Sequence, residues 1–185
     1  MKKTITPILS TALLAVTTLS LCACSSTTKP VTHSSNTPSV VNNQHGYSSG
    51  YLSANDVHVV RIGESVQIII PSDRVFNTSS ANLASSSKGI LYNTAQLVKH
   101  YNTNRIEVAA YTDSTVGNGI SQDRAGVALT NAQAQAISSY LWSQGIDTRY
   151  IYSVGHGSAN PVASNSTPRG QYDNRRVVIS FQYHA

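Results

Sequence analysis

Residues 129–146 read LTNAQAQAISSYLWSQGI, and their apolar side chains recur at the spacing of one face of a helix. The apolar stripe consists of Leu129, Ala136, Ile137, Tyr140 and Leu141. Gly145 follows as a residue suited to a left-handed C-terminal cap, which predicts the end of the helix. Surface helices usually carry Lys and Glu, whereas residues 129–141 have no charged side chain. We therefore predict a helix that is docked on another layer of structure.

The flanking sequence supplies that layer. Apolar and β-branched runs predict five strands, at residues 57–63, 64–71, 105–111, 151–155 and 175–183. Gly63 joins the first two runs as a hairpin, and Pro71 closes the second. A further helix is predicted after Ser85 to Ser87, with one apolar face formed by Ile90, Leu91, Leu97, Val98 and Tyr101. The pattern predicts one α/β domain (an α+β sandwich), a mixed β-sheet with helices packed on one face and an opening β-hairpin.

The first residues have the layout of a secretory signal. Lys2 and Lys3 precede a mostly apolar run that ends in Leu21-Cys22-Ala23-Cys24. This ending resembles a bacterial lipobox, which implies cleavage after residue 23 and lipidation of Cys24. An ordinary signal peptide that contains two cysteines is the alternative. Ser25 follows Cys24 in a way that implies sorting to the outer membrane, with the domain in the periplasm.

A segment rich in Ser, Thr and Asn separates this signal from the domain. Residues 24–56 hold few apolar side chains, so we predict a flexible tether, followed by a domain over residues 57–185. The whole chain has a net charge of +5, which falls to +3 once Lys2 and Lys3 are removed. This mild balance, without a basic run among aromatic residues, gives no indication of nucleic-acid binding.

Four stretches in order resemble the OmpA-like domain, the peptidoglycan-binding module that also occurs in the lipoprotein Pal. They are VFNTSSANL (75–83), VAAYTD (108–113), residues 129–146, and GHGSANPVASNSTPRGQYDNRRVVI (155–179). The last is the most specific, and the resemblance covers about residues 66–181. It implies noncovalent binding of the diaminopimelate-containing stem peptide of the cell wall.

The resemblance also implies the positions of the site. Asp113 matches the family's anion, with Thr112 beside it and a loop of Phe76, Asn77 and Thr78 along the groove. An alternative role for Asp113 is to cap the following turn. Asn77 stands where many relatives carry Asp. Arg175 and Arg176 match a family Arg pair, and we expect them to support the sheet edge and the turn at Asp173.

The family's ligand-binding arginine is replaced. Gln133 occupies its place, and an amide makes weaker hydrogen bonds to a carboxylate than a guanidinium does. Residues 117–127 read as an insertion that either lengthens the helix or forms a loop over the groove. Arg124 within it is either a replacement cation or a solvated charge.

We expect no enzyme activity, because the motifs contain no nucleophile elbow, carboxylate pair or metal signature. The six His residues are not spaced as metal ligands, and no cofactor is implied. Two roles remain. One is a lipoprotein that anchors the outer membrane to peptidoglycan. The other is a structural subunit of an envelope-spanning secretion complex, because the small lipoprotein format and the altered pocket resemble lipoproteins of the type IVB Dot/Icm system.

Overall fold

The computed structural model describes residues 48–101, 103, 105–116 and 120–183. The predicted signal peptide, Cys24 and most of the predicted tether lie outside the described residues. In the part described, no helix has both the length and the apolar character needed to cross a membrane.

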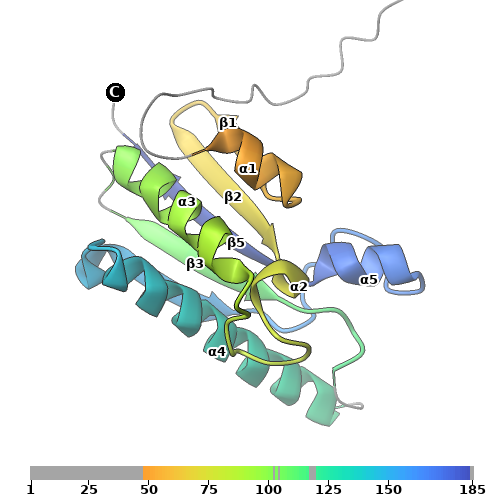
Figure 1. Ribbon diagram of the computed structural model, residues 1–185. Helices are drawn as coiled ribbons and strands as arrows, with labels where there is room; N and C mark the ends of the chain where they lie inside the picture. Colours follow the sequence, from red (N-terminus) through yellow and green to blue (C-terminus); the bar gives the residue numbers. More distant parts are fainter. Residues whose placement is uncertain (1–47, 102, 104, 117–119, 184–185) are drawn as a thin grey trace, which may run out of the picture. The chain divides into compact units, whose positions relative to one another are not determined.

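A five-stranded mixed sheet forms the centre of the domain (Figure 1). In sheet order the strands are β1 (His58–Ile62), β2 (Ser65–Pro71), β5 (Arg176–Gln182), β3 (Ile106–Tyr111) and β4 (Ile151–Gly155). Neighbours pair antiparallel except β3 and β4, which are parallel. Gly63 adopts a φ of 57° between β1 and β2, which confirms the predicted hairpin.

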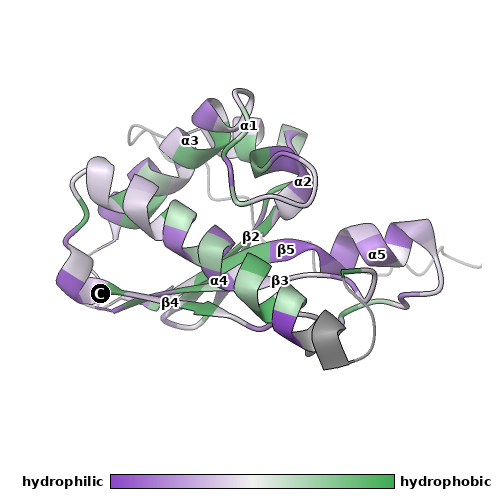
Figure 2. Ribbon diagram, turned by 90° about the horizontal axis from the view of Figure 1, so that it is seen from below, coloured by the Kyte–Doolittle hydropathy of each residue, from purple (hydrophilic) through white to green (hydrophobic). Residues whose placement is uncertain are grey.

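Helices lie on one side of this sheet, as the sequence predicted (Figures 1 and 2). The elements concerned are α1 (Ser49–Ala54), α3 (Ser87–His100) and α4 (Ile120–Ser143). The core forms between their apolar faces and alternate strand residues, such as Ile68 of β2 and Ile179 of β5, which are fully buried. Ile137 and Leu141 of α4 are also fully buried, so the uncharged helix is docked on the sheet.

Helix α4 settles the two alternatives for residues 117–127. It begins at Ile120, so residues 120–127 of the insertion lengthen the helix rather than forming a loop over the groove, and residues 117–119 lie outside the described residues. Gly126 in this extension is buried, and a Cβ there would lie 3.4 Å from the Thr112 side chain and 3.5 Å from Gly157. The added turns therefore pack against the segments that leave β3 and β4.

Helix α1 corrects the predicted tether. Residues 49–54 are helical, and Leu52 is 1% exposed in the core. Ser48 caps the helix by accepting a hydrogen bond from the Tyr51 backbone. The local composition suggested disorder, but one buried leucine and one cap suffice here because α3 offers a surface for docking.

Two short helices lie outside the predicted strands and helices. Helix α2 (Ser72–Val75) follows β2 directly, and α5 (Pro168–Asn174) precedes β5. In α5, Thr167 accepts a hydrogen bond from Gly170 and Pro168 occupies the first turn, a standard helix start. Both helices border the beginning of β5 (Figure 1).

Candidate ligand-binding cleft

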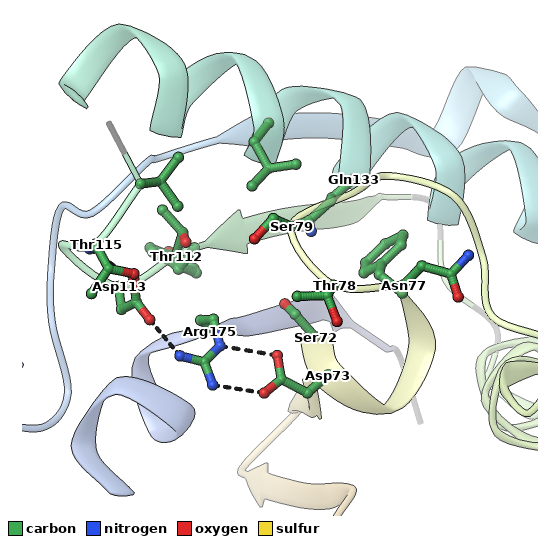
Figure 3. Close-up of a pocket in the computed structure, with 14 residues that line it drawn as sticks. Ser72, Asp73, Asn77, Thr78, Ser79, Thr112, Asp113, Thr115, Gln133 and Arg175 are labelled. Carbon is green, nitrogen blue, oxygen red and sulfur yellow. Dashed lines mark hydrogen bonds and ion pairs between the residues drawn. The ribbon is translucent and has the colours of Figure 1, made fainter. Parts of the chain in front are cut away.

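A cleft of about 380 Å³ opens where α2, the end of β3, α4 and the start of β5 meet (Figure 3). Its wall is largely polar. The lining residues are Ser72, Asp73, Phe76, Asn77, Thr78, Ser79, Tyr111, Thr112, Asp113, Thr115, Val116, Leu129, Gln133 and Arg175. The cleft thus brings together six of the seven residues that the resemblance implied for ligand binding, all except Arg124.

Asp113 lies at the base of the cleft, directly after β3, and is 1% exposed. One carboxylate oxygen accepts hydrogen bonds from the backbone N–H and the hydroxyl of Thr115, and the other accepts from Arg175. Burial raises the pKa of Asp113, but these donors outweigh burial and the net pKa lies below its ordinary value. The carboxylate is therefore ionised at neutral pH and retains one of about four acceptor positions for a ligand.

Arg175 is the cation of this cleft, and no other Lys or Arg is among the described residues that line it. Its Nε and Nη2 donate to the two oxygens of Asp73 at 2.9 and 2.7 Å, while Nη1 donates to Asp113. Pairing with Asp73 raises the pKa of Arg175 above its usual range. We expected this side chain to support the turn at Asp173, which is wrong, because Asp173 pairs with Arg169 at 3.1 Å.

Arg176 takes the supporting role. It is buried, stacks over the Tyr111 ring at 4.0 Å, and donates to the backbone carbonyls of Asn174 and Asn160. Arg176 is the first residue of β5, whereas Arg175 is the C-cap residue of α5 and lines the cleft. One of the pair therefore enters the cleft and the other holds the segment that precedes β5.

Gln133 lines the cleft and also fixes its rim. The side chain is buried, and its Nε2 donates to the Ser80 carbonyl at 2.9 Å. Ser80 belongs to the loop that carries Asn77 and Thr78, and Asn77 closes this loop by a 3.0 Å backbone bond to Asn82. Phe76 is buried beneath it, whereas Asn77 and Thr78 are exposed along the opening.

Arg124 lies outside the cleft. It is exposed and is not among the described lining residues, which favours the alternative of a solvated charge. The helix explains why: Arg124 stands nine residues before Gln133, which is about two and a half turns at roughly 3.6 residues per turn. The two side chains therefore leave α4 on opposite sides.

Ser72 adds an unsatisfied group. Its hydroxyl is buried and has no hydrogen-bond partner among the described residues, although Ser72 lines the cleft. Native proteins rarely leave such a group unpaired. Sequence reasoning missed Ser72, Asp73 and Arg175 as cleft residues.

Within the described residues, no three His, Cys, Asp or Glu side chains gather as a metal site.

The free energy of unfolding should depend on Asp113 in acid. A carboxyl group with a lower pKa in the folded state stabilises the fold fully above its unfolded pKa, near 3.8, and this contribution disappears as the pH falls through the folded pKa. Urea unfolding from about pH 5 to about pH 2 should therefore show a shallower pH slope for Asp113→Asn than for the unaltered protein. Parallel slopes would contradict this assignment.

Comparisons with known proteins find similarity to a lipoprotein and to peptidoglycan-binding proteins. The sequence model of the OmpA family matches residues 75–175. The probable lipoprotein YiaD of Escherichia coli K12 is 36% identical over 129 residues, which cover 70% of this chain and 57% of YiaD. The peptidoglycan-binding protein ArfA of Mycobacterium bovis is 36% identical over 104 residues, covering 56% of this chain and 30% of ArfA. The matches therefore span only part of each relative.

The fold is similar to a solved structure of a cell wall anchor. The anchor of the T6SS from Pseudomonas aeruginosa superimposes with a TM-score of 0.65 at 20% identity, covering 76% of this chain and 100% of that one. At this level of identity, the match shows a shared fold.

Proposed function

The chain belongs to the OmpA family, and from this membership and the cleft at Arg175 we propose that the domain binds the peptidoglycan stem peptide noncovalently. Diaminopimelate in such a peptide carries an ammonium group and carboxylates. A site for it needs an anion, a cation and further polar groups within one groove. The relative named as a peptidoglycan-binding protein and the solved cell wall anchor are consistent with this proposal.

The observation that carries the proposal is the pairing of Arg175 with Asp113 at the base of an open cleft. In this proposal Arg175 binds a ligand carboxylate, because a guanidinium can grip it through two parallel hydrogen bonds. The remaining acceptor position of Asp113 receives the ligand ammonium. Ser72 lines the same cleft and adds a polar side chain to its wall.

The anchoring role extends the proposal to the envelope. Lipidation of Cys24 would hold the protein in the outer membrane, and the domain would reach the wall from the periplasmic side. The similarity to a probable lipoprotein supports this arrangement. The bound wall would then be tied to the membrane without any covalent bond to peptidoglycan, and no catalytic step is involved.

One observation favours a second role as a structural subunit of a secretion complex, such as the type IVB Dot/Icm system. Arg175 is already paired with two carboxylates, and the family's arginine at position 133 is absent. A guanidinium that is already hydrogen-bonded to carboxylates of the same chain binds an external ligand less strongly. This is compatible with a domain that serves mainly for protein contacts.

Co-sedimentation with cell wall separates the two roles. We expect the full-length protein to sediment with purified diaminopimelate-type wall at low salt, and Asp113→Asn to weaken binding by roughly tenfold, since a hydrogen bond to a charged group is lost. Asp147→Asn is the matched control, because Asp147 also pairs with an arginine but does not line the cleft. Sedimentation at background level would refute wall binding and leave the structural role.

A further inference from the structure

A carboxylate of the protein itself occupies the guanidinium fork that a ligand needs. Asp73 makes two parallel hydrogen bonds to Nε and Nη2 of Arg175, which is the geometry that an external carboxylate would adopt (Figure 3). Building on the proposed function, we propose that Asp73 is an internal competitor, and that a ligand carboxylate binds Arg175 by displacing it.

The two carboxylates around Arg175 differ in how easily they can leave. Asp113 is 1% exposed and is also held by Thr115, so it is a fixed part of the base. The Asp73 side chain is 42% exposed, and its only hydrogen bonds in the described structure are those to Arg175. Asp73 can therefore turn into solvent by a side-chain rotation, without exposing any core residue.

The backbone around Asp73 stays in place when its side chain leaves. Helix α2 has four residues, and the Ser72 backbone N–H donates to the Arg175 carbonyl at 2.9 Å. This bond ties the start of α2 to the start of β5 independently of the side chains. A substitution of Asp73 should thus change the net charge of the cleft and the number of unpaired Arg175 N–H donors more than it changes the shape of the cleft.

Charge balance points the same way. With Asp73 in the cleft, two carboxylates face one guanidinium, for a net charge of −1 among the lining residues. An end group with one ammonium and one carboxylate is matched best by one anion and one cation. Departure of Asp73 leaves that pair, Asp113 and Arg175. It also frees two of the five guanidinium N–H donors, next to the unpaired hydroxyl of Ser72.

Asp73 therefore sets both the affinity and the selectivity of the cleft. A ligand with a free carboxylate competes for Arg175, whereas a ligand whose carboxylate is an amide does not gain from the departure of Asp73. Removing the Asp73 carboxylate should therefore strengthen the binding of a ligand whose own carboxylate is ionised.

The test is calorimetric titration of the full-length protein with a soluble stem tripeptide that ends in diaminopimelate. Asp73→Asn should bind this peptide about tenfold more tightly than the unaltered protein, because the competing charged hydrogen bonds are lost. The same peptide with amidated diaminopimelate carboxylates should show less than about a twofold change. Asp147→Asn removes an equally charged, arginine-paired carboxylate outside the cleft and should leave both affinities unchanged.

Each result has a distinct meaning for the two proposals. Weaker binding of the free-acid peptide to Asp73→Asn would overturn the competitor role and make Asp73 a ligand contact. If Asp73→Asn bound the amidated peptide with the same gain in affinity, or if Asp147→Asn bound the free-acid peptide with that gain, the effect would come from the net charge of the protein. Either result would also overturn the competitor role. Binding by Asp73→Asn alone would support the competitor and refute wall binding by the natural protein. Binding by neither protein refutes both.

Discussion

Arg175→Gln is expected to remove binding of diaminopimelate-type cell wall. Arg175 is the one cation among the described lining residues of the cleft, and the amide of glutamine is neutral with a shorter reach. Removing one partner from a buried, hydrogen-bonded charge pair costs about 2–5 kcal/mol of binding energy. The affinity for wall or for the free-acid stem peptide should fall by at least roughly thirtyfold.

This substitution needs a control for stability, because it leaves the Asp113 carboxylate buried without its charged partner. The double variant Arg175→Gln with Asp113→Asn removes both charges and should recover much of the thermal stability without recovering binding. Arg175→Lys keeps the charge but not the fork, and we expect intermediate binding. Wall binding by the double variant at the natural level would show that the ligand site lies elsewhere.

Gly155→Ala is expected to cause a large loss of stability. Gly155 ends β4 directly under α4, and a Cβ there would lie 2.2 Å from the Asn131 backbone nitrogen and 2.6 Å from the Thr130 carbonyl carbon. Both obstacles are helix backbone, so the clash can be relieved only by moving α4 away from the sheet. Overpacking of this kind costs about 3 kcal/mol, which urea unfolding would measure as a lower midpoint.

Gly50→Ala is the matched control for this prediction. Gly50 lies in α1, and a Cβ there has nothing within 4 Å. Alanine in a helix is favoured over glycine by roughly 0.5–1 kcal/mol, so this variant should be neutral or slightly stabilised. If Gly155→Ala unfolded at the same urea concentration as the unaltered protein, α4 would not be held as closely to β4 as the structure indicates.

The sheet and its two long helices could be predicted because their side chains follow simple periods. Alternation in β5 and the stripe of α4 place Ile179, Ile137 and Leu141 in the core, and all three are buried. Helices α1 and α5 could not be predicted in this way, since each is only a turn or two long. Their stability depends on caps such as Thr167 in α5 and, for α1, on contacts with α3.

The cleft was predictable only in part, for a similar reason. Asp113, Thr112 and Gln133 stand in recognisable motifs, so their positions in the cleft followed from the family resemblance. The Asp73–Arg175 pair joins residues 102 positions apart in the chain, and no local pattern reveals it. The pair arises from the sheet: antiparallel pairing of β2 with β5 sets Pro71 opposite Arg176, which brings Asp73 close to Arg175.

The placement of β5 has a consequence for how the domain is made. It is the last of the strands in chain order, yet it lies in the middle of the sheet, between β2 and β3. Until β5 is inserted, the β1–β2 hairpin and the β3–β4 pair share no ladder of hydrogen bonds. Contacts of such long sequence separation slow folding. A chain that is synthesised from its N-terminus would therefore complete its sheet, and with Arg175 its cleft, in one late step.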